Sequence, residues 1–449
     1  SGIAFNCCSA IKLRTLTRLR AESASRCTDD ATSAPHVRRQ RYAGSYPRFF
    51  KDRHKERNGD SQTIAKVVAK GGTPAGQHRP VMLQECLTYL GLPVIQSGSG
   101  PKKVVRKPPI CIDCTLGYGG HSSAILSAIA PLHGALYAID QDHIEISKTS
   151  TRMQPLVDKL EHQYTYKHSI LHTRHANFGH LLKYTDEMSI TGKVTAVLCD
   201  LGYSSMQVDD PSRGFTYKAE GPLDMRMDTT GRIVGSVARS TTPNKAALTT
   251  QSTPLTAYQY LLNISSASAL ASVLSKNSDL APALPIAMAL LGPSKEVRDP
   301  PQTTTEFVNR VRAALATYSK KHTRQRNTAR QDHQAERKVN EVVNYADKTV
   351  VDSCIAKALQ AIRIEVNAEF RMLEMLLQDL PRILAPGGKV VFLTFHSGED
   401  RRVKKALKSG FKDGIYSSWS RDVVLATPEE RFGNSRSKCA KLRWAVRSD

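Results

Sequence analysis

Short apolar runs alternate with longer amphipathic stretches from about residue 110 to residue 201, and again toward the end of the chain. The runs are rich in Val, Ile and Leu and have the length of buried strands. The strands predicted from them are 110–112, 135–139, 168–178, 194–201 and 389–395, with a final strand at 441–446. Strands that alternate with helices at this spacing predict an α/β fold built on a doubly wound, mostly parallel sheet.

The pattern changes beyond the fourth strand, where a Ser- and Thr-rich stretch is followed by alanine- and leucine-rich helical segments. Thr303 and Glu306 form a capping box that opens a helix. A longer helix is predicted over 355–380, because apolar residues recur there at three- and four-residue intervals. We interpret residues 208–345 as a helical insertion between the fourth and fifth strands.

The first predicted strand leads into a glycine turn and then into a helix. Gly117, Gly119 and Gly120 let the backbone bend with positive φ and approach a ligand closely, and the helix that follows presents free N–H groups. The second strand ends at Asp140, about 20 residues after the turn, where a carboxylate can hold two ribose hydroxyls. This order indicates a nucleoside site for NAD or S-adenosylmethionine, and the alternative is a turn that only joins two elements.

Polar groups also follow the fourth and fifth strands. Asp200 ends the fourth strand and could accept hydrogen bonds from an amino group, while Arg213 and Arg226 could bind phosphate or a base. His396 and Asp400 follow the fifth strand. Ligands of such sheets bind outside the carboxyl ends of the strands, so the chemistry is expected at this edge. The alternative is that Asp200 caps a turn and the arginines form local ion pairs.

The charge balance is strongly basic, with 64 Lys and Arg against 41 Asp and Glu and a net charge of +23. The excess lies before residue 60, between 320 and 338, and after 401, which favours an anionic partner such as nucleic acid. The segment up to about residue 57 is rich in Arg, Ser and Ala and poor in acids. We interpret residues 1–60 as an organellar transit peptide, with a disordered basic arm that touches nucleic acid as the alternative.

The cysteines argue against a metal or redox site, and the apolar runs argue against a membrane-spanning protein. Several of the nine cysteines fall within apolar runs, as is typical of a reducing compartment. Cys111 and Cys114 form a C-x-x-C within the first strand without a partner pair, so we expect no zinc, redox or other metal site. Cys199, directly before Asp200, is expected in the core. None of the apolar runs is long enough to span a bilayer, so no membrane partner is expected.

Several sequence blocks recur in the order found in one enzyme family. They are 78–85 (HRPVMLQE), 113–122 (DCTLGYGGHS), 200–207 (DLGYSSMQ), 213–215 (RGF), 221–228 (GPLDMRMD), 360–367 (QAIRIEVN), 395–401 (FHSGEDR) and 440–443 (AKLR). With them the chain resembles the small-subunit ribosomal RNA methyltransferase H (MraW) family, the cytosine-N4 methyltransferases of bacterial small-subunit rRNA, and its mitochondrial members. The block at 223–228 is the most specific, and the N-terminal arm and much of the insertion are unmatched.

The resemblance implies a Rossmann-like class I methyltransferase sheet and S-adenosylmethionine as the cofactor. The cofactor-binding set of the family falls on Gly119, Gly120, His121, Asp140, Phe178, Asp200 and Gln207. The methyltransferase domain would comprise residues 61–207 and 346–449, and the inserted helical domain, 208–345, would hold RNA.

The implied reaction sets a chemical task for the strand ends. The amino nitrogen of cytosine is a poor nucleophile, because its lone pair is delocalised into the ring, so the base must be extruded and held in line with the methyl group. Asp200 is the candidate for orienting the amino group, with His396 and Asp400 as alternative catalytic residues, and no cysteine nucleophile is expected. The basic residues expected to contact RNA are Arg213, Arg226, Lys357 and Arg363.

The chain also departs from the family pattern. Lys357 stands where the family has an arginine and cannot form a bidentate fork, Gly398 replaces a leucine, and a Gly-Glu-Glu-Arg block is missing near 276–288. The first hypothesis is a methyltransferase of the mitochondrial matrix that acts on small-subunit rRNA or on the assembling small subunit. The second is an RNA-binding assembly factor that keeps the fold without turnover. The third hypothesis is a nicotinamide dehydrogenase, which is disfavoured because the sequence shows no acid/base pair for hydride transfer in a separate catalytic domain. The cytoplasm or another organelle is the alternative location, and a homodimer is an open alternative for the oligomeric state.

Overall fold

The computed structural model describes residues 80–93, 107–231, 254–292, 298–331, 345 and 347–449. All of them belong to one compact unit of the chain, residues 54–449. The transit peptide predicted over residues 1–60 lies outside the described residues. None of the described helices combines the length and the apolar composition that crossing a membrane requires.

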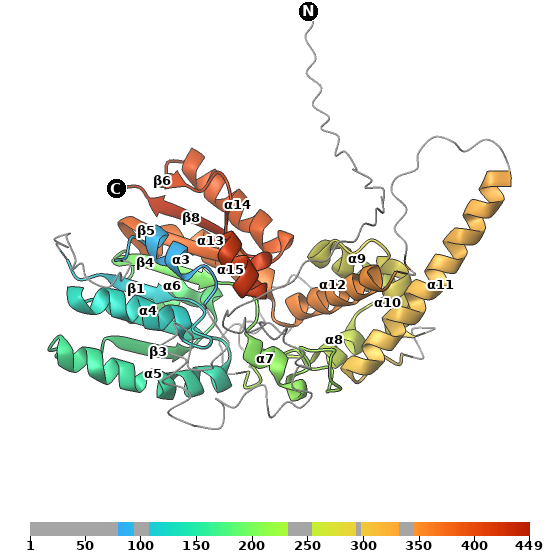
Figure 1. Cartoon of the computed structure of the whole chain (residues 1–449), viewed down its shortest axis with the longest axis horizontal. Helices are drawn as coiled ribbons and strands as arrows, with labels where there is room; N and C mark the ends of the chain where they lie inside the picture. Colours follow the sequence, from blue (N-terminus) through green and yellow to red (C-terminus); the bar gives the residue numbers. More distant parts are fainter. Residues whose placement is uncertain (1–79, 94–106, 232–253, 293–297, 332–344, 346) are drawn as a thin grey trace, which may run out of the picture. The chain divides into compact units, whose positions relative to one another are not determined.

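An eight-stranded sheet forms the centre of the α/β part of the structure, with the strand order β3-β2-β1-β4-β5-β8-β6 and with β7 paired to β8 (Figure 1). The strands are β1 (Ile110–Asp113), β2 (Ala135–Asp140), β3 (Leu171–His175), β4 (Val194–Asp200), β5 (Leu384–Thr394), β6 (Tyr416–Trp419), β7 (Val424–Leu425) and β8 (Lys441–Arg447). Strands β1 to β5 pair in parallel, and the last three are antiparallel. The prediction of a doubly wound, mostly parallel sheet is therefore confirmed.

Helices cover both faces of the sheet because successive strand residues point to opposite sides. On one face Cys111, Leu198 and their neighbours pack against α3 (Leu83–Leu90), α4 (Gly120–Ile129) and α5 (His143–Gln163). On the other face Ile112, Cys199 and their neighbours pack against α6 (Leu181–Glu187), α13 (Glu369–Ile383) and α14 (Ser397–Lys412). Cys199 is fully buried, as predicted.

The helical segments beyond β4 share a core of their own. They are α8 (Ala257–Asn263), α9 (Ala267–Ser278), α10 (Ala283–Leu291), α11 (Thr304–Gln331) and α12 (Lys348–Val366). Buried residues at this core include Leu274, Ile286, Phe307 and Ile355. Helix α12, which the sequence analysis assigned to the methyltransferase domain, thus packs with the helices of the insertion. The shorter elements of the region and of the C-terminal part are α7 (Ser205–Asp209), η4 (Pro211–Arg213), α15 (Pro428–Gly433) and η5 (Ser435–Lys438).

The single long helix predicted over 355–380 is wrong, because the structure divides it into α12 and α13. The break falls at Asn367 and Ala368, and Ala368 has a left-handed φ of 51°. The amide of Asn367 donates to the carbonyl oxygen of Met225 at 2.8 Å and accepts from the N–H of Met227 at 2.8 Å. Contacts with a distant loop thus accompany the break between the two helices. The break interrupts an apolar pattern that continues without a gap along the sequence.

The third and the C-terminal strands differ from the prediction in extent. Strand β3 ends at His175, because the side chain of Asn177 already caps the short η3 turn (Phe178–His180) by accepting from Gly179 N–H at 2.9 Å. Strands β6 and β7 were not predicted, since each is short and pairs only with β8.

The strand order reverses between β1 and β4, because β2 lies on one side of β1 and β4 on the other. Such a reversal opens a crevice outside the carboxyl ends of the two strands. The predicted glycine turn, Asp140 and Asp200 all lie at this edge.

Candidate functional site

The glycine turn between β1 and α4 is shaped by its packing on helix α5. Gly119 has a φ of 81°, and a Cβ atom there would lie 2.7 Å from the sulfur of Met153 and 2.9 Å from the Cγ2 atom of Thr149. The hydroxyl of Thr149 also donates to the carbonyl oxygen of Gly117 at 2.6 Å. The turn is thus held in place at the end of β1 before any ligand is considered.

Asp140 ties the end of β2 to this turn. One carboxylate oxygen accepts from the backbone N–H of Gly117 at 2.7 Å, and the other accepts from the N–H of Asp142 at 2.9 Å. Burial raises the pKa of Asp140 to about 7, and the two backbone hydrogen bonds oppose that rise. The glycine turn and the predicted ribose-binding carboxylate are therefore neighbours.

Asp200 faces His121 across the same edge. The Nδ1 atom of His121 lies 3.5 Å from the Oδ2 atom of Asp200, and the Nε2 atom donates to the carbonyl oxygen of Val81 at 3.0 Å. With Nε2–H committed to Val81, a proton on Nδ1 would point at the carboxylate. The other carboxylate oxygen, Oδ1, is buried without a hydrogen-bond partner among the described residues.

The pKa of Asp200 is raised to about 6, chiefly by burial. His121 opposes this rise, whereas the carboxylates of Asp113 and Glu399 add to it. A buried acceptor oxygen with no partner and a pKa near neutrality suit a group that receives a proton or a hydrogen bond from a ligand.

A buried polar network joins the loop behind β4 to the start of α5. The carboxylate of Asp142 caps α5 and also accepts from Gln207 Nε2 at 2.9 Å and from Arg213 Nη2 at 2.8 Å. The Arg213 guanidinium donates further to the carbonyl oxygens of Arg226 and Met227. Gln207, a predicted cofactor residue, therefore lies at the edge but points its amide into this network.

The residues after β5 divide between two locations. His396 lies with its Nε2 atom 3.1 Å from a carboxylate oxygen of Glu399, whose other oxygen accepts from Phe395 N–H. Asp400 instead forms a fork with Arg443, at 2.6 Å for the shorter contact. Asp400, an alternative catalytic residue in the sequence prediction, is thus bound to Arg443. Glu399, which was not singled out from the sequence, is the acid of this segment that acts on the pKa of Asp200.

Three of the four basic residues expected to contact RNA are paired with carboxylates of the protein itself. Arg226 forks onto Asp224 at 2.7 and 2.8 Å, and Arg363 forks onto Glu369 at 2.8 and 2.9 Å. Arg213 is 9% exposed and bound to Asp142, whereas Lys357 is partly exposed on α12. RNA contact by these residues stays a prediction, and the arginine forks show that they also organise the protein.

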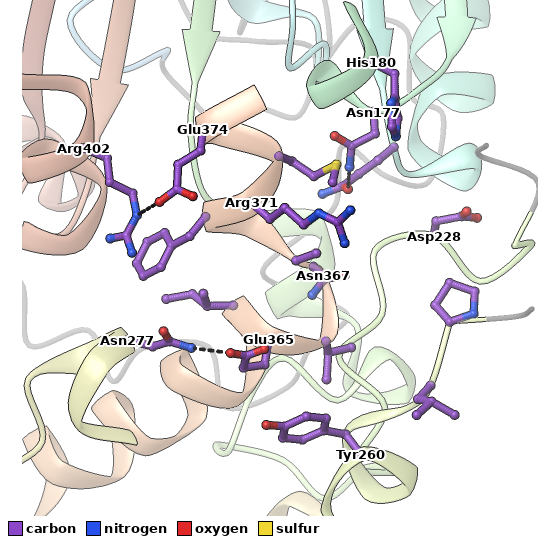
Figure 2. Close-up of a pocket in the computed structure, with 18 of the residues that line it drawn as sticks. Asn177, His180, Asp228, Tyr260, Asn277, Glu365, Asn367, Arg371, Glu374 and Arg402 are labelled. Carbon is purple, nitrogen blue, oxygen red and sulfur yellow. Dashed lines mark hydrogen bonds and ion pairs between the residues drawn. The ribbon is translucent and has the colours of Figure 1, made fainter. Parts of the chain in front are cut away.

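A cavity of about 280 Å³ opens beside the strand ends (Figure 2). Gln141 and Asn177, which follow β2 and β3, line it together with Asn277 of α9, Asn367 at the break between α12 and α13, and Arg371 in the first turn of α13. A smaller hollow of about 20 Å³ shares several of these residues and is also lined by Phe178, Leu201 and Gly202. The predicted residue Phe178 therefore borders a hollow that also touches the segment after β4.

Several residues that line the cavity were not predicted from the sequence. Gln141 and Asn177 could have been predicted, because they follow the ends of β2 and β3, where ligands of such sheets bind. Arg371 was not, since it belongs to a helix whose start is set by the break at Asn367. Three basic side chains, Lys276, Arg371 and Arg402, line the cavity. Figure 2 shows Arg402 paired with Glu374, at 2.9 Å.

Comparison with known proteins gives one consistent family. The sequence profile of the MraW methylase family matches residues 75–239 and 248–448. The chain is 34% identical to ribosomal RNA small subunit methyltransferase H 1 of Lachnoclostridium phytofermentans, over 92% of this chain and 93% of that protein. It is 35% identical to ribosomal RNA small subunit methyltransferase H 2 of Acholeplasma laidlawii, over 92% of this chain and 98% of that protein.

Proposed function

Because the chain belongs to the MraW methylase family, we propose that it transfers a methyl group from S-adenosylmethionine to a cytidine N4 in small-subunit ribosomal RNA. The observation that carries the proposal is the meeting of the glycine turn, Asp140 and Asp200 at one sheet edge, beside a cavity that reaches the inserted helices. A methyl donor and an extruded base must meet in such a place.

The residues at the edge fit a nucleoside-bearing methyl donor. Asp140 offers carboxylate oxygens to ribose hydroxyls, and Phe178, which borders a small hollow beside the segment after β4, offers an aromatic face to the donor. The partnerless Oδ1 atom of Asp200 marks a polar position that the described residues leave unsatisfied. When bound, the donor supplies an electrophilic methyl group at this edge.

Asp200 has the properties that methylation of an amino nitrogen demands. In its ionised form it accepts a hydrogen bond from the amino group, which fixes the direction of the nitrogen lone pair. The nitrogen becomes positively charged when it gains a methyl group and must then lose a proton. A carboxylate with a pKa of about 6 can receive that proton near neutral pH.

The cavity provides the side from which RNA approaches in this proposal. Lys276 and Arg371 place positive charge at its lining, which suits the phosphates that flank an extruded base. Asn277 and Asn367 lie in the same lining, but their amide N–H groups already donate to backbone carbonyl oxygens, so the support from the cavity is its positive charge. The strongly basic composition of the chain supports the same partner, namely small-subunit rRNA or the assembling subunit.

We also place the activity in the mitochondrial matrix. The support is the composition of residues 1–60, which is rich in Arg and Ser and poor in acids. Import of the full chain into isolated mitochondria, followed by protease protection, tests this location. Full sensitivity of the chain to external protease would contradict it.

The experiment that tests the activity is transfer of a labelled methyl group from S-adenosylmethionine to small-subunit rRNA, with nucleoside analysis of the product. We expect N4-methylcytidine from the wild type, loss of donor binding in Asp140→Ala, and loss mainly of turnover in Asp200→Ala. Asp158→Ala, an exposed acid on α5, is the matched control and keeps both. Donor binding without methyl transfer by the wild type would favour the assembly-factor hypothesis, and unchanged activity in both site variants would refute the assignment.

A further inference from the structure

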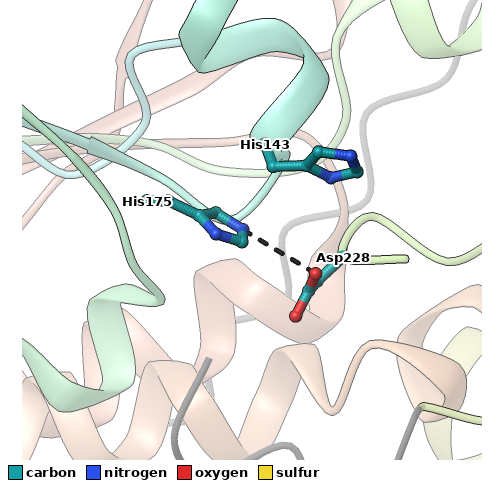
Figure 3. A group of neighbouring side chains, drawn as sticks. All are labelled: His143, His175 and Asp228. Atoms are coloured by element: carbon teal, nitrogen blue, oxygen red, sulfur yellow. Dashed lines mark ion pairs between the residues drawn. The ribbon is translucent and has the colours of Figure 1, made fainter. Parts of the chain in front are cut away.

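Two histidines and an aspartate from three separate segments converge beside the cavity (Figure 3). His143 is the first residue of α5, His175 is the last residue of β3, and Asp228 lies in the segment behind β4. One potential ligand atom from each lies within 4.8 Å of the other two. We name these residues the His-His-Asp triad.

The triad leaves donor atoms buried and unsatisfied. The Oδ2 atom of Asp228 and the Nδ1 atom of His143 are buried without a hydrogen-bond partner among the described residues, and Asp228 is 7% exposed. Burying polar atoms without partners costs free energy, so each such atom calls for an explanation. A bound cation would satisfy both atoms at once.

The surroundings hold the triad in position. The other oxygen of Asp228, Oδ1, accepts from the N–H and the hydroxyl of Thr230 at 2.8 and 2.7 Å, which leaves Oδ2 directed elsewhere. The Nε2 atom of His175 lies 3.7 Å from Asp228 Oδ1 and 3.0 Å from the carbonyl oxygen of Gln141. The two imidazole rings have centroids 5.8 Å apart. Contacts outside the triad thus orient the Asp228 carboxylate and the His175 ring.

We propose that the His-His-Asp triad binds a divalent transition metal ion, with Zn²⁺ as the best match. Two imidazoles and one carboxylate are a ligand set for Zn²⁺ or Fe²⁺, whereas Mg²⁺ and Ca²⁺ prefer oxygen ligands alone. Zinc bonds to histidine nitrogen are about 2.0–2.1 Å long, so the side chains must draw together by about 1 Å from their present separations. Rotation about the side-chain torsions supplies such a movement.

Binding requires a change of tautomer at His175. Its Nε2 atom donates to the Gln141 carbonyl oxygen in the metal-free arrangement. Coordination through Nε2, the atom 3.7 Å from Asp228, needs the lone pair of this nitrogen, so in the bound form the proton resides on Nδ1 and the hydrogen bond to Gln141 is lost. No net proton leaves the ring in this change.

A second group of potential ligands, Glu369, His396 and Glu399, is a weaker candidate. Both oxygens of Glu369 are held by the Arg363 guanidinium, and Glu399 already pairs with His396 and with the backbone N–H of Phe395. A cation there would compete with a bidentate arginine. The His-His-Asp triad has no cationic side chain in that position among the residues the structure describes.

The triad adds a feature to the site that the sequence analysis did not expect. Its members lie at positions 143, 175 and 228, without the short spacing that announces a zinc site, so the expectation of no metal followed from spacing alone. Asp228 also lines the cavity of about 280 Å³. Three protein ligands leave a coordination position for water or for an oxygen of a ligand in that cavity.

The test is metal binding by the full chain, prepared without a histidine tag and stripped with chelator. Titration with ZnCl₂ is followed by calorimetry, and Co²⁺ is added in parallel as a spectroscopic probe. We expect one Zn²⁺ per chain and an affinity at least 100-fold weaker in His143→Ala and in Asp228→Asn. His162→Ala, an exposed histidine on the same helix, should bind as the wild type does.

Two results would overturn the proposal. One is the absence of saturable Zn²⁺ binding by the wild type, or equal binding by Asp228→Asn, which preserves the side-chain shape. The other is an intense sulfur-to-cobalt band, which would assign the metal to cysteines instead. Melting curves of the metal-free variants establish that each is folded, and neither methyl donor nor RNA is needed, so the outcome is separate from that of the proposed function.

Discussion

Replacing His121 by glutamine should move the acid limb of the pH–rate profile to higher pH. The proposed reaction needs Asp200 ionised, so activity should rise with pH through the pKa of about 6 that burial gives this carboxyl. His121 opposes the effect of burial, because an imidazolium 3.5 Å from the carboxylate stabilises the ionised form. Without it the Asp200 carboxyl should hold its proton to higher pH.

The size of the shift follows from the geometry. Two unit charges 3.5 Å apart interact by about 1.2 kcal/mol in a water-like dielectric and by about 5 kcal/mol at an effective dielectric of about 20. The Asp200 side chain is 28% exposed, so the value should lie toward the lower figure. Since a pKa unit corresponds to about 1.4 kcal/mol, the expected shift is about one unit upward.

The assay is the pH dependence of kcat at saturating methyl donor, because His121 is itself a predicted cofactor residue. Donor affinity is measured separately by calorimetry at each pH, so that weaker binding is not taken for a shifted titration. An acid limb that stays in place in His121→Gln would refute the role assigned to His121 and Asp200, as would a normal limb in Asp200→Asn.

Three further substitutions test the site and its supports. Asp140→Asn should weaken donor binding about tenfold, or about 1.4 kcal/mol, in calorimetry, and unchanged affinity would exclude the carboxylate from ribose binding. Gly119→Ala should lower the free energy of unfolding by about 2 kcal/mol in denaturant titrations, because φ is 81° and the new Cβ would lie 2.7 Å from the sulfur of Met153. Arg363→Met should cost about 3 kcal/mol in the same assay by leaving Glu369 buried without its partner, and a neutral result would show that the fork is solvated.

Much of the sheet was predictable because its signals are local. The runs that form β1, β2 and β4 are apolar, have strand length and end at polar or glycine residues. Parallel strands bring their carboxyl ends to one edge, so placing Asp140 and Asp200 on strand ends was enough to place them near each other. Neither step needed a long-range contact.

The division of the long helix was not predictable from the same signals. Apolar residues continue at helical spacing through 355–380, and Asn367 and Ala368 are both tolerated within helices. What marks the break is Asn367 bonded to the backbone of Met225 and Met227, about 140 positions earlier. A pattern read along the chain contains nothing about a partner at that distance, and the cavity beside the break was missed for the same reason.

The arginines show how the same limit affects the assignment of function. Their charge and their place in the family blocks suggested RNA contact, but the partner that a guanidinium chooses depends on the fold. Arg213 binds the Asp142 carboxylate that also caps α5 and accepts from Gln207. Loss of this arginine would therefore disturb the edge proposed for the methyl donor, and an assay of RNA binding alone would attribute the defect to the wrong ligand. Donor affinity and RNA affinity have to be measured on the same variant, because one buried carboxylate, Asp142, binds both Gln207, predicted for the donor, and Arg213, predicted for RNA.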